Sequence, residues 1–234
     1  MQTVEYAAGR LADVVDRPSH TTVLLWHGQQ ADARGSVRRL AKLVADHGLG
    51  VVVPDWDSYA DDGGRDDLLR SVHFARERVD HPDGLILVGW SMGGVAAAGV
   101  TIHAQRLGLR FAHTVCLAGA FMVRDPIVGR IPATELDSGA RPTPFTLLHG
   151  IHDRVIPTTV THEFASALRQ HDWPVKVAEL PADHGSIAGA VYDGITHAYR
   201  AADDPQTLAV AVDVAAHIAD AGRAGDDSHS RSLA

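Results

Sequence analysis

The chain has 234 residues, of which 45% are hydrophobic and 21% are charged, which is enough to bury one sizeable core. Its formal net charge of −8, without any run of lysines and arginines, argues against nucleic acid or a membrane surface as a partner. A single cysteine excludes an internal disulfide, and no apolar segment approaches the roughly 20 residues that span a bilayer. Because the N-terminus lacks the features of a secretion signal, we expect a cytoplasmic protein.

In chain order, residues 1–20 are expected to form an antiparallel hairpin at the edge of a sheet. Six short runs follow that are continuously apolar and rich in β-branched residues. Such runs are typical of strands that are covered on both faces. The runs are 22–26, 50–54, 85–89, 114–118, 145–149 and 175–180.

Three segments between these runs have the apolar spacing of helices. Residues 33–48 end in a glycine, and residues 64–80 place acids early and arginines late, as the helix dipole favours. Residues 158–171 begin on threonines that can cap a helix, just after Pro157. The alternation predicts the α/β class, with a mostly parallel, doubly wound sheet and helices on both faces.

No linker or internal repeat divides the chain, so we expect one domain over residues 1–221. Residues 222–234 lack apolar periodicity and are expected to be a flexible C-terminal tail. Only about 26 residues separate the predicted strands at 114–118 and 145–149, which leaves no room for a large cap domain. Whether the loop at 121–144 acts as a lid is left open.

The motif GWSMG at 89–93 fits the pattern G-x-S-x-G. A predicted strand enters it and a run of small residues, 94–99, follows it, which is the strand–turn–helix setting of a nucleophile elbow. The serine at the centre, Ser91, must adopt strained backbone angles on a very tight turn, so its neighbours two residues away must lack bulky side chains. The alternative is that Ser91 merely caps a buried helix.

A serine hydroxyl is a weak nucleophile until a base takes its proton, so a histidine and an orienting acid are required. Asp153 follows the predicted strand at 145–149, and His184 follows the one at 175–180. Ligand sites form at the carboxyl ends of parallel strands, so we expect both residues to meet Ser91 there.

These motifs resemble those of the α/β-hydrolases, and the resemblance extends over about residues 20–220. The acid motif of that family, G-x-x-D-x-x-[IV]-P, is matched at 150–157, and its x-x-H-G motif is matched at 184–185. The compact chain is most similar to the capless carboxylesterase and dienelactone-hydrolase branches. Dienelactone hydrolases use cysteine where this chain has Ser91, so lactone specificity is in doubt while ester cleavage is not.

The resemblance implies a role for each member of the proposed triad. Ser91 is the nucleophile, His184 is the general base and then the general acid, and Asp153 holds the imidazole tautomer. Asp125, after the strand at 114–118, is the alternative acid, because some family members place it there.

His197 and His217 are distant alternatives to His184 as the base. A different interpretation of the histidines is a metal site. The side chains that such a site would collect are His149, His152, His162 and His184. Their spacing lacks a tight H-x-x-x-H or a flanking carboxylate, so we expect no metal and no other cofactor.

Acyl transfer develops negative charge on the carbonyl oxygen, and backbone N–H groups should stabilise it. One donor should be Met92, directly after the nucleophile. The loop "LLWHGQQ" contains a His-Gly pair that resembles the oxyanion motif of the family, so Gln29 is the second candidate and His27 is structural. The predicted pocket walls are Trp56, Tyr59, Trp90, Phe121, Met122, and Ile151 or Ile187.

The sequence therefore predicts a serine hydrolase that cleaves small-to-medium carboxylic esters through an acyl-enzyme. Its partner is a small-molecule ester, and the oligomeric state is left open. The alternatives are an acyl-thioesterase or amidase, a lactone hydrolase, and a hydrolase-fold protein that binds a ligand without turnover.

Overall fold

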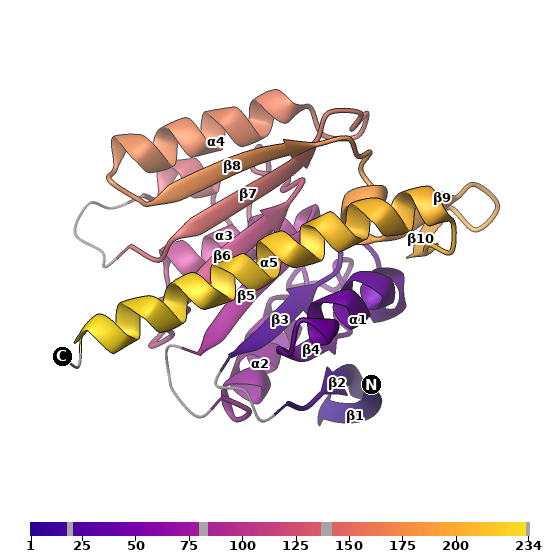
Figure 1. Cartoon of the computed structure of the whole chain (residues 1–234), viewed down its shortest axis with the longest axis horizontal. Coiled ribbons are helices and arrows are strands. Elements are labelled where there is room, and N and C mark those ends of the chain that lie inside the picture. The colour runs from indigo at the N-terminus through magenta and orange to yellow at the C-terminus, as the bar shows by residue number, and fades with distance from the viewer. Residues whose placement is uncertain (18–20, 80–83, 137–141, 233–234) are drawn as a thin grey trace.

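An eight-stranded sheet crosses the centre of the molecule, with helices on both faces (Figure 1). The structure, a computed structural model, describes residues 1–17, 21–79, 84–136 and 142–232, and it describes side chains in the last helix only up to residue 223. The strands of this sheet are β1 (Gln2–Ala7), β2 (Arg10–Val15), β3 (Thr22–Trp26), β4 (Gly50–Pro54), β5 (Leu85–Trp90), β6 (His113–Leu117), β7 (Phe145–Gly150) and β8 (Val175–Leu180).

The strand order across the sheet is β1-β2-β4-β3-β5-β6-β7-β8, and the strands from β3 to β8 all pair in parallel. The predicted α/β class with a mostly parallel sheet is confirmed. All six predicted strands of the parallel part are present, within one residue of the expected bounds. The carboxyl ends of these strands lie at one edge of the sheet, where their loops meet.

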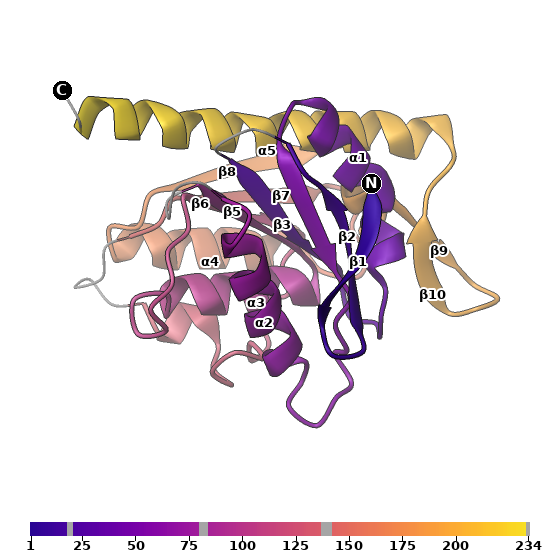
Figure 2. The same ribbon diagram turned by 90° about the horizontal axis from the view of Figure 1, so that it is seen from below.

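Helices cover the two faces of the sheet in separate layers. They are α1 (Arg38–Asp46), α2 (Arg65–Arg76), α3 (Met92–Ile102), α4 (Thr158–Gln170) and α5 (Pro205–Ser232). Figure 2 shows α1 and α5 on one face and α2, α3 and α4 on the other. Side chains of β3 alternate between the layers, because Val23 and Leu25 pack in the α1/α5 core while Leu24 and Trp26 pack in the opposite core. This double burial explains why the strand sequences are continuously apolar.

The start of α2 shows how the local sequence sets a helix boundary. The carboxylate of Asp62 accepts hydrogen bonds from the backbone N–H groups of Gly64 and Asp66, each at 2.9 Å. Gly64 has φ 83°, a conformation that glycine adopts without strain. Asp66 and Asp67 lie in the first turn, where the helix dipole favours negative charge.

The predicted N-terminal hairpin is confirmed for the part that the structure describes. Strands β1 and β2 pair antiparallel, with Gln2 opposite Val14. Strand β2 then pairs antiparallel with β4, with Ala12 opposite Pro54, so the hairpin extends the parallel sheet at one edge. Residues 18–20 of the expected hairpin lie outside the described residues.

A second hairpin was not predicted. Strands β9 (Ala190–Asp193) and β10 (Ala198–Ala201) pair antiparallel and form a separate small sheet. It projects from the end of the molecule at the carboxyl edge of the main sheet (Figures 1 and 2). A sequence signal for it exists, since "AVYDGITHAYRA" at 190–201 places an Asp-Gly pair between two short alternating segments.

The segment expected to be a flexible C-terminal tail continues the last helix. Helix α5 extends to Ser232, so the backbone of residues 222–232 is helical. Val214 and Ile218 of α5 are fully buried in the core that it shares with α1, and this docking anchors the helix. Propagation from an anchored helix costs little, since each further residue adds one hydrogen bond. The flexibility of the segment and the domain boundary at residue 221 stay predictions.

No large cap covers the carboxyl edge of the sheet. Between β6 and β7, the described residues form turns and one short 3-10 helix, Pro132–Thr134, while residues 137–141 lie outside the described part. Among the described helices, none has the length and apolar character needed to cross a membrane.

Candidate active site

Ser91 occupies a sharp turn between β5 and α3. Its backbone angles are φ 55° and ψ −114°, a strained conformation for a residue with a side chain. A Cβ atom on Gly89 would overlap the carbonyl oxygen of Gly93, and one on Gly93 would overlap the carbonyl oxygen of His27. Both glycines of the G-x-S-x-G motif are therefore required by the close approach of backbone to backbone.

The crowding at the turn predicts a large effect of adding one methyl group. We expect Gly89→Ala to lower the free energy of unfolding by about 3 kcal/mol, because the rigid backbone of Gly93 cannot move aside without distorting the elbow. Gly35→Ala is the matched control, since a Cβ atom at that position meets nothing within 4 Å. Urea denaturation of both variants checks this. Equal midpoints for the two variants would contradict the steric argument.

The structure brings together the three side chains that the sequence placed at the ends of β5, β7 and β8. Nε2 of His184 lies 3.0 Å from Oγ of Ser91, and Nδ1 of His184 lies 2.7 Å from Oδ2 of Asp153. The other carboxylate oxygen, Oδ1, accepts hydrogen bonds from the backbone N–H groups of Val155 and Ile156. Because a carboxylate only accepts, Nδ1 of His184 carries the proton and Nε2 is left to accept one from Ser91.

A second histidine, His149, also lies beside the carboxylate of Asp153. His149, the penultimate residue of β7, is fully buried; its Nε2–H donates to the carbonyl of Ile156 at 2.9 Å and lies 3.5 Å from Oδ2 of Asp153. Burial alone would raise the pKa of Asp153. Hydrogen bonds from His149, His184 and the Ile156 N–H outweigh burial and hold this pKa well below its usual range. The carboxylate is therefore ionised at neutral pH. This contact of His149 was not predicted from the sequence, where His149 only ends an apolar strand.

The two expected oxyanion donors come from the start of α3 and from the loop after β3. Met92 is the first residue of α3, and among the described residues neither its N–H nor that of Gln29 has a hydrogen-bond acceptor. The Gln29 loop passes close to the elbow, because a Cβ atom on Gly28 would lie 3.2 Å from the Trp90 ring and 3.4 Å from Cβ of Ser91. Free N–H groups beside a nucleophile can stabilise a developing negative charge.

His27 holds the loop that carries Gln29. Its Nε2 accepts the backbone N–H of Ala33 at 3.2 Å, its Nδ1–H donates to the carbonyl of Gly28 at 2.8 Å, and its ring stacks on Trp56 at 5.2 Å. The side chain is fully buried, and this burial lowers the pKa of His27 to about 4. A neutral, structural His27 agrees with the sequence analysis.

The lowered pKa of His27 predicts how stability depends on pH. Unfolded His27 binds its proton near pH 6.5, whereas folded His27 does so near pH 4, so acid favours the unfolded chain. The stabilising contribution is complete above pH 6.5 and is lost as the pH falls toward 4. We expect the loss between pH 7 and pH 5 to be about 2 kcal/mol smaller in His27→Gln than in the wild type.

Urea denaturation at the two pH values measures this difference. His47→Gln is the control for the removal of an exposed histidine, because His47 is exposed at the end of α1. An identical loss of stability in wild type and His27→Gln would show that His27 does not contribute in this way.

The alternative triad members lie elsewhere. Asp125 is buried in its own loop, where Oδ1 accepts the backbone N–H groups of Ile127 and Val128. His197 pairs with the hydroxyl of Tyr192 at 3.2 Å, and His217 lines a separate cavity next to β7 and β8. None of these three side chains has a described contact with Ser91.

Three of the expected pocket walls are core residues instead. The exposed fractions of Trp56, Trp90 and Phe121 are 0%, 1% and 3%, so their rings are covered by other side chains. The indole N–H of Trp90 is not available to a substrate, because it donates a hydrogen bond to the carbonyl of His184 at 2.8 Å. A large aromatic ring after a strand either faces the site or folds back onto the sheet, and the local sequence does not distinguish these two outcomes. Ile151 is exposed, as a residue at the rim should be.

The other three predicted pocket walls also divide into buried and exposed side chains. Ile187 is fully buried, whereas Tyr59 and Met122 are exposed. The exposed candidates come from loops that follow β4, β6 and β7, so the edge of the sheet around Ser91 carries apolar side chains in contact with solvent.

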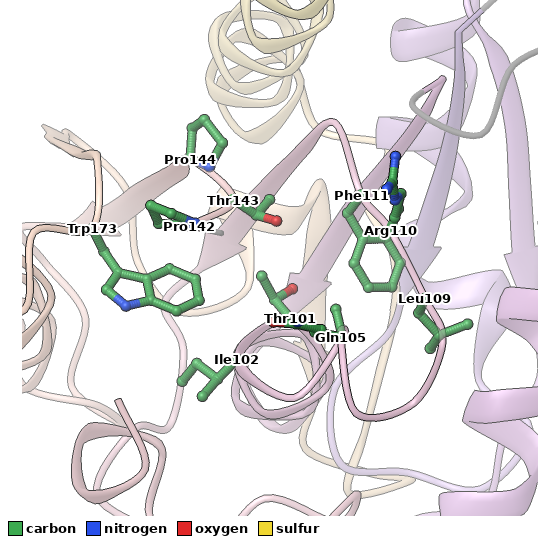
Figure 3. A pocket seen from close by; sticks show the side chains of 11 residues that line it. Thr101, Ile102, Gln105, Leu109, Arg110, Phe111, Pro142, Thr143, Pro144 and Trp173 are labelled. Atoms are coloured by element: carbon green, nitrogen blue, oxygen red, sulfur yellow. The ribbon is translucent and has the colours of Figure 1, made fainter. Parts of the chain in front are cut away.

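A cavity of about 440 Å³ adjoins His184. It lies between the loop after β7, the loop after β8 and the β9–β10 hairpin, and its walls include Arg154, Val155, Tyr192 and Tyr199. A second cavity, of about 310 Å³, lies at the opposite edge of the sheet between the end of α3 and the starts of β6 and β7 (Figure 3). Since the second cavity contains none of Ser91, Asp153 and His184, it is separate from this site.

The histidines do not assemble into a metal centre. Among the described residues, no three histidine, cysteine, aspartate or glutamate side chains are arranged to hold an ion. His149 and His184 both point to Asp153, while His162 pairs with Glu179 at 2.8 Å on the surface of the molecule. His149 and His184 thus share one carboxylate, and His162 lies apart from them.

Comparisons with known proteins agree on one fold. A family model described as "Alpha/beta hydrolase family" matches residues 23–232. Esterase 2 of Thermogutta terrifontis, phosphoramylated by tabun, superposes with a TM-score of 0.68 at 14% identity, covering 93% of this chain and 94% of that chain. EstE5, soaked with p-nitrophenyl butyrate, gives 0.67 at 14% identity, with 95% and 84% covered.

A putative carboxylesterase from Lactobacillus plantarum gives a TM-score of 0.63 at 16% identity, covering 80% of this chain and 88% of that chain. No curated protein sequence matches the chain. At these identities, the structural likeness shows the fold alone.

Proposed function

Because the chain belongs to the alpha/beta hydrolase family, we propose that it is a serine hydrolase that cleaves small-to-medium carboxylic esters through an acyl-enzyme. One observation carries the proposal: Ser91, on a strained elbow, lies 3.0 Å from a histidine nitrogen that is free to accept its proton. The ionised carboxylate of Asp153 on the other side of the ring fixes the tautomer that makes this possible.

The reaction follows from this arrangement. As Oγ of Ser91 attacks the ester carbonyl carbon, its proton passes to Nε2 of His184, and the carbonyl oxygen becomes an oxyanion. The imidazolium is stabilised by Asp153, which stays ionised. His184 then protonates the alkoxy oxygen, the alcohol leaves, and the acyl group remains on Ser91. A water molecule that gives its proton to His184 attacks the acyl carbon, and collapse of the second oxyanion releases the carboxylic acid and regenerates Ser91.

The N–H groups of Met92 and Gln29 would stabilise both tetrahedral oxyanions. Each preorganised donor of this kind contributes about 3 kcal/mol to transition-state stabilisation in serine hydrolases. His27 supports this role indirectly, because it fixes the loop of Gln29 through the carbonyl of Gly28 and the N–H of Ala33. A donor that is already in place costs no reorganisation when the charge develops.

The surroundings of Ser91 favour a substrate of modest size. Without a large cap, the site opens directly to solvent, and the cavity of about 440 Å³ beside His184 accommodates a small-molecule group. His184 is the residue that protonates the leaving alcohol, so this cavity is suited to the alcohol portion of the ester. The alkyl or aryl part of that alcohol would contact Val155 and Tyr192.

A panel of p-nitrophenyl esters from acetate to octanoate tests the proposal. EstE5, which has the same fold, was soaked with an ester of this kind, p-nitrophenyl butyrate. We expect turnover of the short and medium esters by the purified protein, and a covalent adduct on Ser91 after treatment with a fluorophosphonate. Acyl-thioesters and lactones measured in parallel would show whether another acyl substrate is preferred. Absence of both turnover and adduct would overturn the proposal.

A further inference from the structure

The imidazole of His184 is enclosed by two aromatic rings. The ring of Trp90 lies 5.6 Å from it, and the ring of Tyr199 lies 6.0 Å from it. Tyr199 and Trp90 also contact each other edge-on, with centroids 4.8 Å apart and an interplanar angle of 87°. Trp90 belongs to the core of the sheet, whereas Tyr199 comes from β10 in the hairpin that projects beyond it.

The backbone of Tyr199 is bound by Gln30, from the loop after β3. The side-chain amide of Gln30 pairs with its backbone: Oε1 accepts the Tyr199 N–H at 2.8 Å, and the Nε2–H donates to the Tyr199 carbonyl at 3.3 Å. This two-way pairing imitates the way in which a neighbouring strand would bind β10. Gln30 follows Gln29 directly in the loop after β3, so the hairpin is attached to the loop of the proposed oxyanion donor.

The Tyr199 ring also packs against the loop that carries His184. A Cβ atom on Gly185, the next residue, would lie 3.0 Å from the Tyr199 ring, which shows how closely the ring is packed on this loop. Trp90 fixes the backbone of His184 through the hydrogen bond to its carbonyl, but that bond does not prevent the side chain from rotating. The Tyr199 ring packs beside the imidazole at an interplanar angle of 59°.

We propose that Tyr199 is a positioning residue for His184 and that Gln30 fixes Tyr199, so that the β9–β10 hairpin holds the base in line with Ser91. This proposal rests on the proposed serine-hydrolase function. Its physical basis is orientation: a reacting group displaced by about 1 Å loses about 100-fold in rate. The tyrosine acts through its ring, since no described hydrogen bond uses its hydroxyl.

The test compares Tyr199→Ala with Tyr199→Phe in the full chain. We expect Tyr199→Ala to lower kcat for p-nitrophenyl butyrate by about 10- to 100-fold with KM changed by less than threefold. Tyr199→Phe keeps the ring and should restore the wild-type kcat. If Tyr199→Ala does not fold, Tyr199→Leu takes its place, since leucine restores apolar volume without a flat ring.

A spectroscopic measurement separates positioning from a general structural effect. The proton between Nδ1 of His184 and Asp153 should give a strongly downfield NMR resonance, because its hydrogen bond is short and charge-assisted. The resonance, assigned by its loss in His184→Ala, should be retained in Tyr199→Phe and broadened or lost in Tyr199→Ala. Gln30→Ala should weaken it and lower kcat in the same direction. Gln170→Ala, on the exposed end of α4, should change neither kcat nor the resonance.

Wild-type kcat and an intact resonance in Tyr199→Ala would overturn this inference while leaving the proposed function untouched. A wild-type protein without esterase activity would instead remove the proposed function, and the NMR comparison would still report on the contact between Tyr199 and His184.

Discussion

Replacing Ser91 by alanine should lower kcat for p-nitrophenyl butyrate by about 10⁵-fold. The hydroxyl of Ser91 is the nucleophile of the proposed acyl-enzyme, and no other described serine or threonine hydroxyl contacts His184. The methyl group of alanine fits the space of the Cβ atom, so the fold and the oxyanion donors should persist. Steady-state kinetics and fluorophosphonate labelling, both on a protein with a wild-type circular dichroism spectrum, measure the loss.

The matched control for this variant is Ser166→Ala. Ser166 lies on an exposed face of α4, and its hydroxyl has no described hydrogen bond. We expect wild-type kcat and full labelling from this control. Residual activity above about one per cent in Ser91→Ala, or continued labelling of it, would mean that another residue is the nucleophile.

Replacing Asp153 by asparagine should lower kcat by about 10⁴-fold. Two backbone N–H groups point at Oδ1, so the amide oxygen of asparagine would stay there and its NH₂ group would face His184. Nδ1 of His184 would then have to accept a hydrogen bond from this NH₂ group, and the ring proton would move to Nε2. With that proton in place, Nε2 donates to Ser91 and can no longer take the serine proton, although all distances stay similar.

Asp183→Asn tests whether the effect is specific. Asp183 immediately precedes His184, and its Oδ1 also accepts two backbone N–H groups, from Gly185 and Ser186, yet no described contact links it to the imidazole. Asparagine can preserve both hydrogen bonds, so kcat should stay within about threefold of the wild type. A decrease of less than tenfold in Asp153→Asn would contradict the assigned tautomer.

The sequence predicted the parallel sheet well because its strands are buried on both faces. Double burial produces short, uniformly apolar segments, and the glycine-flanked Ser91 marks one strand end unambiguously. The loops of Asp153 and His184 could then be placed together by topology alone, since parallel strands end at one edge. Their hydrogen-bonding distances are consistent with that placement.

What the sequence did not predict depends on packing between distant segments. Nothing near Trp90 in the chain reveals that its indole binds the carbonyl of His184, and the stacking of Phe121 on Phe164 joins the turn after β6 to helix α4. His149 was placed correctly at the end of a strand, but its contact with Asp153 requires the turn of the following loop. Local patterns determine where elements begin; the neighbours of a side chain are set by the assembled fold.

The pairing of Gln30 with Tyr199 joins segments 169 positions apart. During folding, such a distant contact forms late, because a long loop must close first, and a nascent chain cannot form it until most of the protein has left the ribosome. The same contact lies in a small projecting hairpin, a kind of element that opens locally at low free-energy cost. Mild heating would therefore open the hairpin and abolish the catalytic activity while the central sheet is still folded.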